Sequence, residues 1–190
     1  MSAHRRPQKT ASPRQTGAGF TLVEMMIAIV ILMVLLAAAA PDFRKTLQNQ
    51  RLTASTNDLF SAILLTRSEA IARGTRMDMV PAVGTDWASG WLIFEDANNN
   101  QARDTAETLV FSHGPLAPGV TVTTTLPGPA HLTYSGMGRS RNKTTSQSMR
   151  SGSFLISLDG SERKIVINML GRARVCTPVP KKIPDDAADC

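Results

Sequence analysis

Oxygen-bearing side chains crowd one short stretch of the chain, residues 96–107, at a spacing that could hold a calcium ion. They fall at positions one, three, five, nine and twelve of the stretch, as Asp96, Asn98, Asn100, Asp104 and Glu107. Such oxygens are typical Ca²⁺ ligands, but Gln101 stands at position six, where a calcium loop needs glycine for its sharp turn. The same residues suit a hairpin turn whose Asn and Asp side chains bond the local backbone. We expect that turn and no metal site, with calcium binding as the alternative.

Basic side chains gather without acids in two later stretches, and their chemistry suits phosphate groups. Their members are Arg139, Arg141, Lys143 and Arg150 in one polar loop, then Arg172 and Arg174 with Lys181 and Lys182 beyond. Guanidinium and ammonium groups on loops can contact successive phosphates of DNA without reading its bases. Arg172 and Arg174 would project to the same side of an extended segment and reach one DNA backbone. The alternative is a set of solvated charges that keeps the protein soluble.

No arrangement of residues points to catalysis. His113 and His131 stand apart from any metal-ligand or nucleophile spacing, and the chain has no glycine-rich phosphate loop. Cys176 and Cys190 lack the close Cys or His companions of a zinc site. The two cysteines could form a disulfide in an oxidising compartment, or remain thiols on a frayed tail. We therefore expect neither an enzyme nor a cofactor.

The elements that would position these groups begin with a long apolar segment. Residues 20–40 read FTLVEMMIAIVILMVLLAAAA, in which Glu24 is the only charge. A helix of this length, at about 1.5 Å per residue, matches a hydrocarbon core of roughly 30 Å, so we expect a transmembrane helix. The basic residues 1–19 should stay in the cytoplasm, with the remainder of the chain outside. A secretory signal cleaved near residues 37–40 is the alternative, but it leaves Glu24 unexplained.

The start of this apolar segment carries a family resemblance. Residues 19–24, GFTLVE, followed by the unbroken apolar run, resemble the processing and assembly motif of type IV pilins and type II secretion pseudopilins. The resemblance implies that a prepilin peptidase cuts after Gly19 and methylates Phe20. It also implies that Glu24 pairs with the N-terminal amine of a neighbouring subunit and that the helix kinks or locally melts at Pro41.

An amphipathic helix and then a series of strands are predicted after Pro41. Apolar residues recur at three- and four-residue steps up to Arg73, and Gly74 is a natural helix stop. Short β-rich runs follow at residues 91–94, 109–112, 120–125, 131–134, 153–158 and 164–168. This order predicts an α+β fold, with the helix laid across an antiparallel sheet. The expected divisions are a leader 1–19, a transmembrane and assembly helix 20–40, an amphipathic helix 41–74, a β-rich domain 75–175 and a tail 176–190.

The strand region extends the resemblance and indicates a function. Residues 90–96, GWLIFED, are similar to the GspH/FimT branch, and residues 171–174, GRAR, match a motif implicated in DNA capture by FimT-like minor pilins during natural transformation. The resemblance implies a FimT-like minor pilin that helps assemble or initiate a type IV pilus and binds DNA non-specifically for natural transformation. It also implies a single-pass protein of the bacterial inner membrane with a periplasmic domain, later incorporated into a pilus or pseudopilus. Its expected partners are other pilins or pseudopilins, the prepilin peptidase, an inner-membrane assembly platform and double-stranded DNA.

A GspH-like minor pseudopilin of the type II secretion system, with no DNA role, is the alternative function. Total charge does not decide between the two, because most of the net charge of +6 belongs to the leader. A chain starting at Phe20 has 17 basic and 15 acidic residues, a net charge of +2. One such subunit should bind DNA weakly, so several copies or a filament tip would be needed for avidity.

Overall fold

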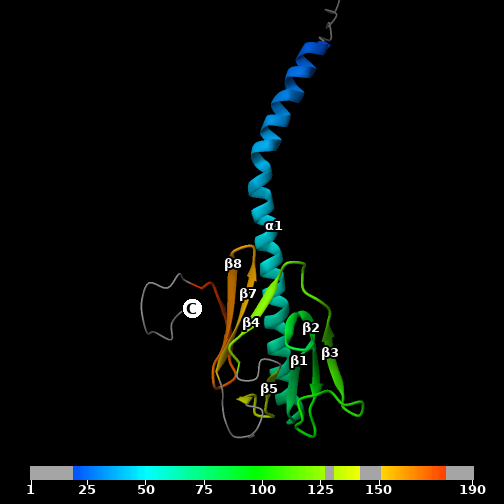
Figure 1. Cartoon of the computed structure of the whole chain (residues 1–190), viewed down its shortest axis with the longest axis vertical. Helices are drawn as coiled ribbons and strands as arrows, with labels where there is room; N and C mark the ends of the chain where they lie inside the picture. Colours follow the sequence, from blue (N-terminus) through cyan, green and yellow to red (C-terminus); the bar gives the residue numbers. More distant parts are fainter. Residues whose placement is uncertain (1–18, 127–130, 142–150, 179–190) are drawn as a thin grey trace, which may run out of the picture. The chain divides into compact units, whose positions relative to one another are not determined.

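The computed structural model describes residues 19–126, 131–141 and 151–178, the side chains of residues 37–42 excepted. Within these ranges one α-helix precedes nine β-strands (Figure 1). The elements are α1 (Leu22–Arg73), β1 (Met77–Val83), β2 (Asp86–Glu95), β3 (Leu109–His113), β4 (Thr121–Thr124), β5 (Leu132–Tyr134), β6 (Ser140–Arg141), β7 (Gly152–Leu158), β8 (Ser161–Ile167) and β9 (Ala173–Cys176).

The helix α1 begins and ends where its sequence provides caps. At its start the Thr21 hydroxyl accepts the Glu24 backbone N–H at 3.2 Å, and the Thr21 backbone N–H donates to the Glu24 carboxylate at 2.9 Å. This reciprocal pair satisfies two backbone donors that a helix start leaves open. At its end Gly74 takes a φ of 67°, the left-handed conformation that glycine adopts without strain. The predicted end of the helix at Arg73 is confirmed.

The helix is continuous through position 41, where we expected a kink or local melting. The backbone at Pro41 is helical, so the expected melting is not present. Proline removes one helical hydrogen bond, and the turns on either side can still close. Residues 37–42 therefore join the apolar and amphipathic parts of one helix.

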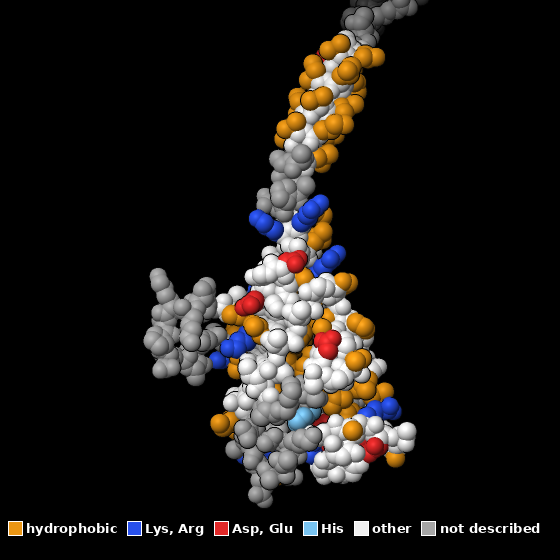
Figure 2. Space-filling view, viewed as in Figure 1, with side chains coloured by type: hydrophobic (Ala, Val, Ile, Leu, Met, Phe, Trp, Pro, Cys, Tyr) orange, Lys and Arg blue, Asp and Glu red, His pale blue; other side chains and the backbone are white. Residues whose placement is uncertain are grey.

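The contacts of the chain divide it into two compact units, Met1–Phe43 and Arg44–Cys190. In the first unit the large apolar side chains between Leu22 and Leu36 are 49% to 75% exposed, and Figure 2 shows them as orange atoms along the helix. Among the residues whose side chains are described, no helix has the length and apolar character needed to span a membrane. The predicted span 20–40 includes side chains outside that set, and leader residues 1–18 also lie outside the described residues.

The strands form two antiparallel sheets, where the sequence predicted one. Their orders are β3-β2-β1-β5-β6 and β4-β7-β8-β9. The six predicted runs all overlap observed strands, whereas β1, β6 and β9 were not foreseen. Pro81 obscures β1 because proline cannot donate to a sheet ladder, and the β1–β2 register shifts between Pro81 and Val83. The predicted α+β class is confirmed, with the second sheet as a correction to its layout.

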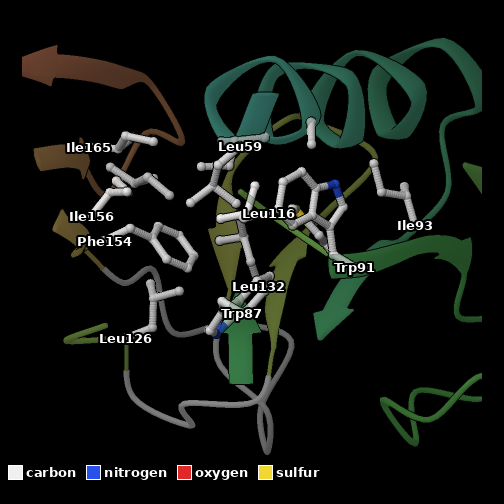
Figure 3. Packing of buried hydrophobic residues seen from close by; sticks show 14 of the residues in the cluster. Leu59, Trp87, Trp91, Ile93, Leu116, Leu126, Leu132, Phe154, Ile156 and Ile165 are labelled. Carbon is white, nitrogen blue, oxygen red and sulfur yellow. The ribbon is translucent and has the colours of Figure 1, made fainter. Parts of the chain in front are cut away.

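The hydrophobic core of the second unit joins α1 to both sheets. Figure 3 shows Leu59 of α1 above a cluster that includes Trp91 of the first sheet and Phe154 of the second. The rings of Trp87 and Phe154 meet edge to face at 4.9 Å and so link the two sheets directly. Every residue of this cluster lies after Arg44. The Arg44–Cys190 unit therefore contains its own core and should fold without the first unit.

Candidate nucleic-acid interface

The final hairpin places Arg172 and Arg174 at the edge of the second sheet. Residues 168–172 connect β8 to β9, and Arg174 lies within β9 opposite Val166 of β8. Both arginine side chains are exposed. Residues 171–174, GRAR, come after the last β-rich run predicted from the sequence, at residues 164–168, but they lead into one further strand, β9, which begins at Ala173. Short edge strands of this kind depend on a pairing partner that local sequence does not specify.

Arg172 and Arg174 line one shallow hollow on the protein surface. The hollow has a volume of about 430 Å³, and its other lining residues are Val166, Asn168 and Ala173. Alternate residues of an extended segment face the same side, which agrees with the same-side projection predicted for the two arginines. A phosphate group entering this hollow would meet two guanidinium groups rather than one.

Asn168 fixes the backbone of the turn that carries Arg172. The Asn168 side-chain oxygen accepts the backbone N–H groups of Leu170 at 3.0 Å and Arg172 at 2.9 Å. The Asn168 carbonyl oxygen also accepts the Gly171 N–H at 2.9 Å. Gly171 completes the turn with a φ of 77°, a conformation that other residues adopt only with strain. The backbone beneath Arg172 is therefore ordered while its side chain extends into solvent.

Gly171 also brings the 168–172 turn into contact with the 135–139 turn, which carries Arg139. A Cβ atom on Gly171 would lie 2.3 Å from the Gly138 carbonyl oxygen and 2.7 Å from the Tyr134 ring. The Tyr134 hydroxyl donates to the Gly171 carbonyl at 3.1 Å, and burial raises the pKa of Tyr134, which keeps that hydroxyl protonated. The turns that carry Arg139 and Arg172, about thirty residues apart in the sequence, are therefore in contact.

The other residues predicted to bind phosphate differ in their exposure and position. Arg139 is exposed at the end of the 135–139 turn. Arg141 is half-buried in β6, paired with Thr133 of β5, so the predicted polar loop is a strand at this position. The predicted residues that lie outside the described ranges are Lys143, Arg150, Lys181 and Lys182.

Two basic residues near this location were not among the predicted binding residues. Arg67 of α1 donates from Nε to the Gly138 carbonyl at 2.9 Å and from Nη2 to the Leu170 carbonyl at 3.4 Å. Lys164 of β8 lines a neighbouring hollow of about 290 Å³ with Glu162 and several hydroxyl side chains. An isolated basic residue in a helix or strand gives no sequence signal for such a position.

In the predicted hairpin turn at residues 96–107, side-chain oxygens accept hydrogen bonds from backbone N–H groups of the same turn. The Asp96 carboxylate accepts the backbone N–H groups of Asn100 and Gln101, both at 3.1 Å. Glu107 accepts the backbone N–H of Asp104 at 3.1 Å. Among the described residues no group of three or more His, Cys, Asp or Glu side chains could hold a metal ion. The arrangement is that of a turn whose side chains satisfy local backbone groups.

Arg76 links this turn to β1 through a buried cluster of charged side chains. Its guanidinium contacts both oxygens of Asp78, at 3.0 and 2.8 Å, and lies 3.1 Å from Asp96. Both carboxylate side chains are fully buried. Burial raises the pKa of Asp78 to about 6, an effect that Arg76 only partly opposes. The cluster joins β1 to the turn after β2, and its charges face one another rather than solvent.

Comparison with known families assigns the chain to a class. Residues 55–171, more than half of the chain, match the family described as type II transport protein GspH, and residues 15–40 match the prokaryotic N-terminal methylation motif. The chain belongs to the GspH family. The predicted GspH/FimT resemblance is therefore confirmed. No curated protein matched this GspH-family sequence.

Solved structures of pilin-like proteins are similar to this GspH-family chain. The type IV minor pilin FimU of Pseudomonas aeruginosa strain PAO1 gives a TM-score of 0.54 at 18% identity, over 67% of this chain and 90% of FimU. A second crystal form of FimU gives 0.51 at the same identity, over 65% and 90% of the two chains. The minor pseudopilin EpsH of the Vibrio cholerae type 2 secretion system gives 0.46 at 16% identity, over 67% and 98%. FimU supports the fold and carries no further conclusion at this identity.

Membership of the GspH family defines the general role. The protein is a pilin-like member of the family described as type II transport protein GspH, and is a filament component rather than an enzyme. Its family and its methylation motif imply inner-membrane anchoring, processing by the prepilin peptidase and assembly with other pilins. Cleavage after Gly19, methylation of Phe20 and the intersubunit role of Glu24 stay predictions at the level of single residues.

The structure describes one of the two cysteines in the predicted disulfide. Cys176, the last residue of β9, is disulfide-bonded. Cys190 is the other cysteine of the chain and lies outside the described residues, so its pairing with Cys176 stays a prediction. The disulfide lies at the end of β9, the strand that contains Arg174.

Proposed function

We propose that this protein is a FimT-like minor pilin of a type IV pilus that binds double-stranded DNA. The binding site is the arginine surface, defined as Arg139, Arg172 and Arg174. The observation that carries the proposal is the contact between the 135–139 and 168–172 turns, in which a Cβ on Gly171 would meet the Gly138 carbonyl at 2.3 Å. This contact supports one continuous binding surface made from two basic segments that are separate in the sequence.

The chemistry of the arginine surface suits phosphate groups. Guanidinium groups form charge-assisted, often bidentate hydrogen bonds with phosphate oxygens, and such contacts do not depend on base sequence. Arg172 and Arg174 make no ion pair with any described residue, so they need not break one to bind a ligand. The protein should therefore bind DNA without sequence preference, and each phosphate contact should add to the salt dependence.

Exposed apolar side chains on the same two turns also favour a partner at this surface. Met137 is 80% exposed, Met169 is 56% exposed and Leu170 is 49% exposed. Apolar side chains between cationic ones can contact sugars and base edges when the cations hold the phosphates.

The second candidate function is that of a GspH-like minor pseudopilin of the type II secretion system without a DNA role. The observation that favours it is the family match itself, whose description is type II transport protein GspH. This function predicts other pseudopilins as partners and a secretion defect when the gene is deleted. It uses the same fold and the same N-terminal processing.

The test is a gel-shift titration of the Arg44–Cys190 unit with double-stranded DNA over a salt series. We expect the unaltered unit to lose affinity as salt rises, and the Arg172→Ala/Arg174→Ala variant to bind about tenfold more weakly or worse, with a salt slope lower by roughly two contacts. The matched control is Arg51→Ala/Arg103→Ala, which removes two exposed arginines elsewhere in the same unit. Absence of binding by the unaltered unit at low salt would reject the DNA function and leave the pseudopilin role.

A further inference from the structure

The geometry points to Arg67 of α1 as a positioning residue that holds the two arginine-bearing turns together as one DNA-binding surface. The inference rests on the proposed DNA-binding function and assigns a role to a residue outside the arginine surface. Arg67 acts on DNA binding through the two turns and not by contact with phosphate. Its loss should therefore weaken binding without removing a phosphate contact.

The guanidinium of Arg67 bridges the two turns through their carbonyl groups. Its Nε atom donates to the Gly138 carbonyl at 2.9 Å, and its Nη2 atom donates to the Leu170 carbonyl at 3.4 Å. Gly138 belongs to the turn of Arg139, and Leu170 belongs to the turn of Arg172. One side chain from a third segment of the chain thus bonds both halves of the arginine surface.

The Gly138 carbonyl oxygen is the point at which all three segments meet. It accepts the Arg67 hydrogen bond, and it lies 2.3 Å from where a Cβ on Gly171 would be. Gly138 is also pressed against α1, because a Cβ at that position would lie 2.6 Å from the Ile71 side chain and 3.2 Å from Nε of Arg67. Glycine at positions 138 and 171 allows the helix and both turns to approach this closely.

An arginine is suited to this position for a geometric reason. Its Nε–H and one Nη–H donate in parallel from a rigid planar group, so they can reach two acceptors with a fixed separation. A lysine ammonium keeps the charge but is a compact point donor on a flexible stem. Arg67 is also partly buried, which makes its donors less accessible to phosphate than those of Arg172 and Arg174.

The link between the turns should matter for affinity because DNA binding requires an ordered surface. Without Arg67 the Gly138 and Leu170 carbonyls lose their shared donor, and the two turns can move independently. Binding would then have to order them, which lowers affinity although every phosphate ligand is still present. We expect Arg67→Gln to bind DNA about tenfold more weakly with an unchanged salt slope.

The experiment compares Arg67→Gln, Arg67→Lys and the control Arg51→Gln in the Arg44–Cys190 unit. Arg51 is an exposed residue of the same helix, so its substitution removes the same charge without touching either turn. DNA affinity is measured over a salt series, and hydrogen exchange is measured at the Gly138 and Gly171 amides. Exchange at β7 and β8 reports whether each variant is folded.

The expected result is faster exchange at both glycine amides in Arg67→Gln, unchanged exchange in β7 and β8, weaker DNA binding at constant salt slope, and no recovery by lysine. Binding equal to that of the Arg51→Gln control would overturn the inference. Full recovery by lysine, or a salt slope lower by about one contact without faster exchange, would show that Arg67 acts as a charge on phosphate and would also overturn it. If the unaltered unit binds no DNA, the proposed function fails, and this role of Arg67 fails with it, whereas the exchange data still show whether Arg67 couples the turns.

Discussion

A partly buried arginine and two exposed arginines of the Arg44–Cys190 unit have opposite environments. Arg76 contacts two fully buried carboxylates, those of Asp78 and Asp96. Arg172 and Arg174 are exposed and make no ion pair with any described residue. Arg76 holds β1 against the turn after β2, whereas Arg172 and Arg174 extend from an ordered hairpin into solvent.

The difference separates charges that maintain the fold from charges that are available to a ligand. A buried charge is tolerated only with a partner, and removal of that partner leaves a strongly unfavourable charge behind. An exposed charge contributes little to stability, so its substitution should affect binding alone. The comparison therefore predicts that stability and DNA affinity depend on different arginines of the same unit.

Removal of Arg76 should have the largest effect on stability. Arg76→Ala would leave the buried carboxylates of Asp78 and Asp96 facing each other without a cation, at a cost of about 3–5 kcal/mol in the free energy of unfolding. Denaturant unfolding of the Arg44–Cys190 unit measures this loss. Arg103→Ala, at an exposed position of the 96–107 turn, should cost less than about 0.5 kcal/mol. Equal losses for the two variants would contradict the proposed division.

Gly171→Ala should affect both stability and DNA binding, because this glycine lies where the two turns meet. The added Cβ would approach the Gly138 carbonyl at 2.3 Å and would occupy a backbone with φ of 77°, for an expected loss of about 2–3 kcal/mol. Gly160→Ala is the control, since Gly160 has a φ of 80° but nothing within 4 Å of the added atom. Denaturant unfolding and gel shifts should show that only Gly171→Ala loses DNA affinity. A similar DNA affinity for both variants would show that the contact between the turns does not matter for binding.

The buried cluster should also make stability depend on pH. Burial raises the pKa of Asp78 from 3.8 to about 6, so the folded state keeps a proton that the unfolded state releases. The contribution of Asp78 to stability is therefore complete below about pH 4 and is lost as pH rises through 6, a change on the order of 1–3 kcal/mol. Denaturant unfolding between pH 4 and 7.5 should show this slope, and Asp78→Asn should reduce it. An unchanged slope in that variant would assign the pH dependence to other groups.

Calcium should have the smallest effect of all. Asp96 already contacts Arg76 at 3.1 Å and accepts two backbone N–H groups, so a cation would have to displace existing partners. Thermal melting of the Arg44–Cys190 unit should therefore be the same with millimolar Ca²⁺ and with a chelator. A melting temperature that rises with Ca²⁺ would mean that the turn binds a cation and that its carboxylates are available to a ligand.

Local features of the sequence were sufficient to predict the helix end, six of the strands and the family. The end of α1 at Arg73 follows from the glycine after it, and the β-rich runs follow from residue type and alternation over a few positions. The motif at residues 19–24 likewise depends only on neighbouring residues. These predictions succeed because short-range sterics, capping and amphipathic spacing are encoded within a few residues of the chain.

The positions of the arginines relative to one another depended on tertiary structure. Arg67, Gly138 and Gly171 come from three distant segments, and their meeting point exists only after α1 and the two sheets have packed. Periodicity indicates which face of an element is buried but not which element covers it, so neither β9 nor the role of Arg67 could be predicted. The sequence by itself determined that this protein is a pilin-like filament component with two basic segments. Only tertiary packing brought their two turns together, because a contact between distant segments depends on the arrangement of every element between them.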